Sequence, residues 1–97
     1  MKATFEVTTE KGNAAQVTAV GRNAWALSEL VDAGIKGCTP ISHPGPRWSA
    51  YVHRLRKDYG LNIETVLESH SGPFPGKHAR YVLRTPVRLV AAESEAA

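Results

Sequence analysis

Segment 47–59 carries the residues with the clearest potential for chemistry, because basic and small side chains recur on one face of a potential helix. Read at 100° per residue, that polar face and its borders carry Arg47, Ser49, Ala50, His53, Arg54, Arg56 and Lys57. Arg54 could bond guanine in a bidentate manner, and Lys57 could contact a base or a phosphate. The pattern favours DNA recognition, although a basic amphipathic helix is also common as a plain solvated surface.

The start of this segment suits anion binding. Arg47 and Ser49 could bind a phosphate with the help of the helix N-terminus. Ala50 is small enough to approach a thymine methyl group. His53 faces away from the core beside Arg54, so we expect it on the same outer surface.

The opposite face of the segment requires a core. Its apolar residues follow an i, i+3, i+4, i+7, i+11 pattern: Trp48, Tyr51, Val52, Leu55 and Tyr59. Pro46 suits the first helical position, and Gly60 can adopt the left-handed conformation that ends a helix. We therefore expect a helix over 46–59.

The other elements follow from periodicity and turn residues. Alternation over 3–8 and 15–20 predicts a β-hairpin within residues 1–20. Helical spacing over 23–33, with Asn23 as N-cap and Gly34 as the stop, predicts a first helix. Prolines and glycines exclude a long helix between 35 and 46. Alternation over 61–68 and 79–84 around a Pro/Gly loop predicts a second hairpin.

This order of elements is α+β and is that of a winged helix-turn-helix. We expect one domain over 1–88, with an N-terminal hairpin (1–20), a helix-turn-helix (23–60) and a C-terminal hairpin wing (61–86). Residues after about Pro86 lose the pattern, so 89–97 are expected to form a disordered tail. The helix 46–59 would enter the major groove and the wing, over 70–80, would lie on the DNA backbone, with Lys77, His78 and Arg80 as contacts.

Charge is distributed unevenly along the 97 residues, whose net charge is +3. Lysine and arginine balance aspartate and glutamate over 1–46, whereas 47–88 hold eight basic and three acidic residues, a local net of +5. Two glutamates follow, Glu93 and Glu95. A positive field confined to one half is typical of a surface that binds polyanions.

Several stretches carry a family resemblance. They are 37–41, 44–52, 55–56, 60–65 and 76–83, which read GCTPI, PGPRWSAYV, LR, GLNIET and GKHARYVL. Over about residues 3–86 the chain resembles a family of small winged-helix-domain proteins of bacteria and their phages. The resemblance implies a DNA-binding fold without demonstrated chemistry. We expect the chain to be a small transcriptional regulator of bacterial or phage origin. The chain departs from the helix-turn-helix pattern at 39–45, where the slot for the second helix holds two prolines.

Other kinds of site find little support. The four histidines and Cys38 lack the pair spacing of metal ligands, so no metal or other cofactor is expected. Cys38 is interpreted as a small buried residue rather than a nucleophile. Because the sequence has no phosphate-binding glycine loop and no acid/base pair of carboxylates, we expect no catalytic residue and no enzyme.

The expected partner is double-stranded DNA, and a domain of this size favours a homodimer on a two-fold site. The main alternative is a protein-interaction module, which gains support if Asp58, Glu64 and Glu68 neutralise the basic residues. RNA binding ranks last, since Phe5 and Tyr81 face inward by pattern. A single cysteine and the lack of an apolar run of about 18 residues predict a cytoplasmic protein without membrane association.

Overall fold

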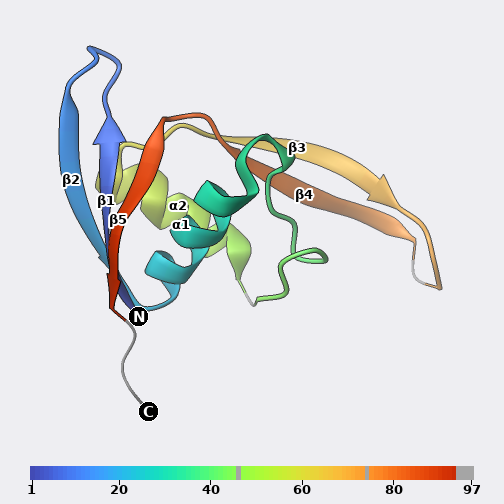
Figure 1. Ribbon diagram of the computed structural model, residues 1–97. Helices are drawn as coiled ribbons and strands as arrows, with labels where there is room; N and C mark the ends of the chain where they lie inside the picture. The colour runs from blue at the N-terminus through green and yellow to red at the C-terminus, as the bar shows by residue number, and fades with distance from the viewer. Residues whose placement is uncertain (46, 74, 94–97) are drawn as a thin grey trace.

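The computed structural model describes residues 1–45, 47–73 and 75–93, which form two small sheets and two helices (Figure 1). In chain order the elements are β1 (Lys2–Thr8), β2 (Ala14–Val20), α1 (Arg22–Ala33), the 3-10 turn η1 (Gly34–Lys36), α2 (Trp48–Tyr59), β3 (Ile63–His70), β4 (Gly76–Leu83) and β5 (Val87–Glu93). One sheet has the strand order β2-β1-β5, and the other is the hairpin β3-β4. All strand pairs are antiparallel.

The core lies between the three-stranded sheet and the helices. Along β1, Ala3, Phe5 and Val7 alternate inward and are buried, because successive side chains of a strand point to opposite faces. They meet Leu27 and Leu30 of α1 in one cluster. The β3-β4 hairpin projects beyond the helices as a long arm (Figure 1).

Helix α2 confirms the strongest expectation from the sequence. Its buried side chains, Trp48, Val52 and Leu55, belong to the predicted apolar face. Gly60 ends the helix in the left-handed conformation at φ 64°, and its N–H bonds to the Arg56 carbonyl, as expected. At the other end Arg47 has φ 65° and precedes the first helical residue, while the expected start at Pro46 lies outside the described residues.

Between the helices the chain makes a compact turn in place of a second helix. Thr39 is buried, and its Oγ1 accepts hydrogen bonds from the backbone N–H groups of Ile41 and Ser42. Just before it, Cys38 forms an isolated antiparallel bridge with Tyr81 of β4. This bridge ties the start of the turn to the wing.

Helix α1 starts slightly earlier than predicted. Its N-cap is Gly21, whose carbonyl accepts a hydrogen bond from Trp25 N, so the assignment of Asn23 as N-cap was wrong. Gly21 follows the last residue of β2 with φ 66°, a positive value that favours glycine, and leads directly into the helix. Gly34 caps the C-terminal end as expected, and its N–H bonds to the Leu30 carbonyl.

The C-terminal segment contradicts the sequence interpretation. Residues 89–93 are not a disordered tail: they belong to β5, which pairs along β1 and completes the sheet. A register shift between Thr4 and Phe5 interrupts the two-residue period, so Leu89 and Val90 are both exposed and no alternation shows in the sequence. Residues 94–97 lie outside the described residues.

Candidate nucleic-acid interface

The outer face of α2 carries the basic residues that the sequence placed there. Arg47, Ser49, His53, Arg54 and Lys57 are exposed. Within the described part of the chain, the arginines and the lysine of this set form no salt bridge. Their charges are therefore available to an anion.

Near the N-terminal end of α2, the same face carries a small side chain. Ala50 is half-buried, one turn before His53 and Arg54. A methyl group at this point lets another surface approach the helix backbone closely.

Arg56 has a structural role that its spacing alone did not indicate. Its guanidinium donates to the Ile63 carbonyl from Nε at 3.2 Å, and from a terminal nitrogen as well. It also donates to Thr65 Oγ1 at 2.9 Å. Since Ile63 and Thr65 begin β3, Arg56 fixes the direction in which the wing leaves α2.

Arg22 adds a cation near the beginning of α2, which sequence reasoning missed. Its guanidinium carbon lies 4.2 Å from the centre of the Trp25 ring, and its Nε donates to Tyr51 Oη at 3.3 Å. Trp25 in turn packs against Trp48, with ring centroids 5.3 Å apart. No pattern in the sequence indicated this placement, because Arg22 belongs to the half of the chain in which charges cancel.

The base of the wing contains an ion pair that restrains a predicted contact residue. Arg80 donates to both oxygens of Glu68, from Nε at 2.9 Å and from a terminal nitrogen at 2.7 Å. Its other terminal nitrogen donates to the Lys36 carbonyl of η1 at 2.6 Å. Hydrogen bonds from Arg80 and then from His78 lower the pKa of Glu68 to about 2, so the carboxylate is ionised.

His78 is also engaged within the wing. Its Nε2 lies 2.7 Å from Glu68 Oε1, and its Nδ1 lies 2.8 Å from His70 Nδ1. Only 13% of its side chain is exposed. With both ring nitrogens in use, His78 has no free donor for a phosphate, whereas Lys77 beside it is exposed.

The acidic residues named as a test of charge placement behave differently from one another. Glu68 holds Arg80, and Glu64 accepts two hydrogen bonds from Arg84 at the wing base. Asp58 forms no salt bridge with the described residues. Neutralisation therefore affects the wing arginines but not the cations on the outer face of α2.

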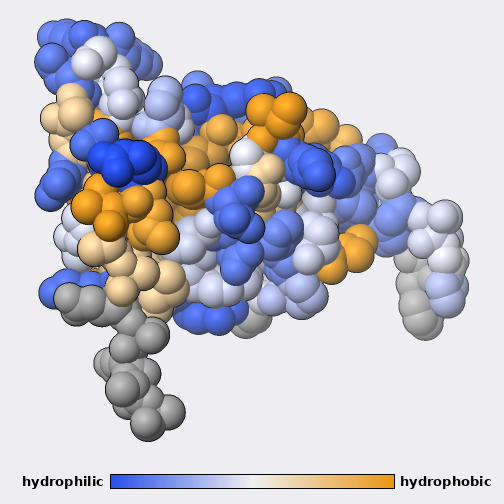
Figure 2. Space-filling model, viewed as in Figure 1, coloured by the Kyte–Doolittle hydropathy of each residue, from blue (hydrophilic) through white to orange (hydrophobic). Residues whose placement is uncertain are grey.

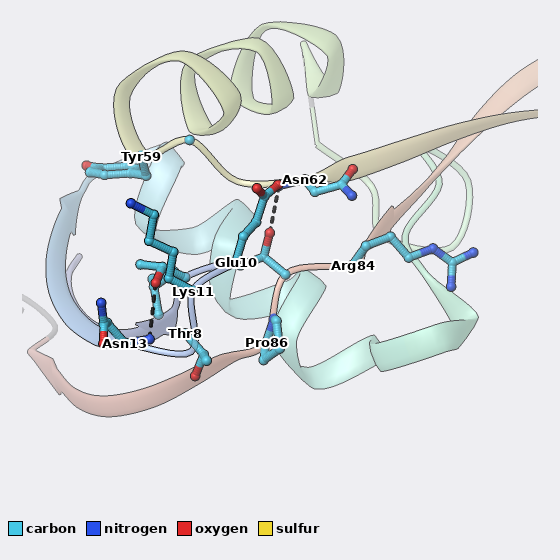
Figure 3. A pocket seen from close by; sticks show the side chains of 12 residues that line it. Thr8, Glu10, Lys11, Asn13, Tyr59, Asn62, Arg84 and Pro86 are labelled. Carbon is cyan, nitrogen blue, oxygen red and sulfur yellow. Dashed lines mark hydrogen bonds between the residues drawn. The ribbon is translucent and has the colours of Figure 1, made fainter.

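A cleft of about 630 Å³, lined by both polar and apolar residues, lies where the β1-β2 turn meets the end of α2 and the base of the wing (Figure 3). Glu10 and Lys11 line it with opposite charges, next to the ring of Tyr59. Arg84 points away from them in Figure 3. Its guanidinium donates a hydrogen bond to Glu64. The cleft thus adds no net positive charge to the surface of α2.

The remaining candidates for chemistry are structural. Cys38 is fully buried, and burial is the main cause that raises its thiol pKa to about 12, so the neutral thiol prevails. Among the described residues, no group of three histidine, cysteine or carboxylate side chains is placed to hold a metal ion. Neither helix in the described ranges is long and apolar enough to cross a membrane.

The comparison with known families identifies one match. A family model described as a winged helix domain matches residues 16–93, from β2 through the helices and the wing to the end of β5. No curated protein and no solved structure matches the chain.

Proposed function

Because the chain belongs to the winged helix domain family, we propose that it binds double-stranded DNA as a small transcriptional regulator of a bacterium or phage, acting in the cytoplasm. In this proposal α2 lies in the major groove and the β3-β4 wing lies on the neighbouring backbone. The observation that carries it is the outer face of α2, where Arg54 and Lys57 are exposed and free of described ion pairs.

Each residue of this face has a distinct role in the proposal. Arg54 and Lys57 reach base edges or phosphates, and His53 lies beside them. Arg47 and Ser49 bind a phosphate at the start of α2, where Arg22 adds further positive charge. Ala50 allows close approach, and on the wing Lys77 contacts the backbone.

The two other wing residues predicted from the sequence have indirect roles. His78 and Arg80 direct their donors at Glu68, and Arg80 also bonds to η1. We assign them to holding the wing in position, with Arg56 fixing its direction from α2. Phosphate contacts set affinity and register, so a rigid wing would define the orientation of the domain on DNA.

A salt titration on random-sequence duplex DNA tests the proposal. The double variant Arg54→Ala, Lys57→Ala should bind more weakly, and the slope of log affinity against log salt should fall by up to about 1.8, at about 0.9 per phosphate contact. The control is Lys2→Ala, Arg88→Ala, which removes the same charge from the three-stranded sheet. It should leave the slope unchanged.

Two results would contradict the proposal. The first is an absence of binding by the wild type at low salt. The second is an equal loss of slope in both double variants, which would show that only the net charge of the protein matters.

An interaction with protein is the second candidate, favoured by apolar side chains on β5. Leu89 and Val90 are 41% and 43% exposed, and β5 has β1 as its only neighbour in the described sheet. Figure 2 shows apolar side chains gathered over β5 and the adjoining helix α1. A homodimer would cover this surface and would suit a two-fold DNA site. Sedimentation equilibrium that shows a monomer both free and on DNA would exclude the homodimer.

A further inference from the structure

The wing holds a row of hydrogen-bonded side chains that ends at His70, a residue without a role so far. The row runs from Glu68 through His78 to His70, with atom separations of 2.7 Å and 2.8 Å. The imidazole centroids lie 5.0 Å apart at an interplanar angle of 30°. That separation is close to the Nδ1–Nδ1 distance plus the two ring radii, so the rings meet nitrogen to nitrogen rather than face to face.

Counting protons along this row gives one arrangement for the neutral histidines. The Glu68 carboxylate is ionised and can only accept, so His78 Nε2 carries a hydrogen. In a neutral ring His78 Nδ1 is then bare. His70 must donate to it from Nδ1, which leaves His70 Nε2 as a bare acceptor.

If the histidine pair binds one further proton, only one ring nitrogen is free to carry it. The gap between the two Nδ1 atoms holds one hydrogen, and His78 Nε2 already carries another. Whichever ring holds the gap hydrogen more closely, the added proton leaves an N–H at His70 Nε2. Proton uptake therefore converts that nitrogen from an acceptor into a donor and gives the pair a charge of +1.

His70 lies where such a donor can be used. It is the last residue of β3, next to the wing tip, and it pairs with Gly76 across the hairpin. Its Nε2 has no hydrogen-bond partner among the described residues. The one side-chain polar atom of those residues that is buried without a partner is Ser28 Oγ, so His70 Nε2 reaches solvent.

The surrounding charges leave this site positive once the proton is added. On β4, Lys77 is exposed one position from Gly76, and Arg80 is held by Glu68. On β3, Glu68 is bonded to Arg80 and His78 at the far end of the row. From η1, Lys36 contributes its carbonyl, which Arg80 occupies.

We propose that His70 is a proton-dependent phosphate contact of the wing, which binds the DNA backbone only when the His70–His78 pair carries its additional proton. The inference rests on the proposed DNA-binding function. Glu68 and His78 act as positioning residues, because they fix which nitrogen of His70 faces solvent. Binding to DNA then takes up a proton at the wing.

The first experiment needs no DNA. Long-range ¹H–¹⁵N NMR at pH 8 should find His70 as the Nδ1–H tautomer and His78 as the Nε2–H tautomer. In His78→Gln, His70 should revert to the Nε2–H form that free imidazole side chains favour. A wild-type His70 with its hydrogen on Nε2 at pH 8 would overturn the inference.

The second experiment measures affinity for duplex DNA between pH 8 and pH 6. Wild-type affinity should rise as the pH falls, by up to about tenfold per pH unit for one linked proton. His70→Gln should remove one proton from that linkage, while the matched control His43→Gln, which lies outside the wing, should retain it. Repeating the comparison in proteins that also carry His53→Gln removes any contribution of the α2 histidine to the pH dependence.

The outcomes distinguish the two proposals. If the wild type binds no DNA at either pH, the proposed function and this inference both fail. If the wild type binds and His70→Gln keeps the full pH dependence, the inference alone fails.

Discussion

Gly37 offers the sharpest test of how the wing is attached to the helices. It is buried, has φ +69° and precedes Cys38, which bridges to Tyr81. A Cβ built at Gly37 would lie 2.6 Å from the Tyr81 carbonyl oxygen and 2.9 Å from Val82 Cγ2. Gly37→Ala must therefore push Cys38 away from β4.

The magnitude follows from a matched control, Gly34→Ala. Gly34 also has a positive φ, +58°, but nothing lies within 4 Å of its built Cβ. Each substitution costs about 1–3 kcal/mol in backbone strain. Gly37→Ala also disrupts the hydrogen bonds in both directions between Cys38 and Tyr81, worth about 0.5–1.5 kcal/mol each. The free energy of unfolding should thus fall by about 1–3 kcal/mol more in Gly37→Ala than in Gly34→Ala.

Urea denaturation followed by tryptophan fluorescence measures this difference. Trp48 lies 6.1 Å from Tyr81 between ring centroids, so its emission also reports on the attachment directly. Equal losses of stability in the two variants would refute the reasoning, because the contact with Tyr81 would then contribute nothing.

Three further predictions concern individual side chains. The Glu68 pKa lies below its ordinary 4.5 in the folded protein, so its contribution to stability is present above pH 4.5 and is lost as the pH falls toward 2. The drop in the urea midpoint between pH 7 and pH 3 should therefore be smaller in Glu68→Gln than in the wild type. Cys38, buried with a thiol pKa of about 12, should resist thiol reagents at pH 8 and react only as urea unfolds the protein, and rapid reaction without urea would contradict its burial. Arg56→Lys loses the forked hydrogen bonds to Ile63 and Thr65 and should lower the free energy of unfolding by about 1 kcal/mol, whereas Arg54→Lys should be neutral in the same urea titration.

The sequence was most informative where structure is local. The pattern of Trp48, Val52 and Leu55 predicted both the helix and its buried face, because helical periodicity depends only on near neighbours. Gly60 marked its end for the same reason. The order of elements was enough to predict the winged-helix class, which the family match over 16–93 confirms.

Contacts between distant segments were not predictable in the same way. The pairing of Glu68 with His78 depends on the register of the β3-β4 hairpin, which the long Pro/Gly loop does not determine. The attachment of Arg56 to β3 depends on the angle at Gly60. The contacts of Arg22 depend on how the two helices pack.

Strand β5 was missed for a related reason. Its partner β1 lies at the other end of the sequence, and a register shift opposite Phe5 breaks the alternation that would have revealed it. A strand of small and apolar residues with such an irregularity has little local signal. Its place in the sheet is determined by backbone pairing with the side of β1 that β2 does not occupy.

The central position of β1 has a consequence for how the chain folds. Its inward residues rest on α1 and its backbone pairs on both sides, yet the second of those partners is the last strand of the described chain. A ribosome would release β1, β2 and both helices before β5 exists, which leaves one edge of β1 open to other chains until β5 has been synthesised. Such a long-range pairing is slow to form, so closure of the sheet by β5 should be a late step of folding. Because the paired ends of β1 and β5 lie side by side, joining them by a short linker and opening the chain elsewhere would turn this last step into a local hairpin.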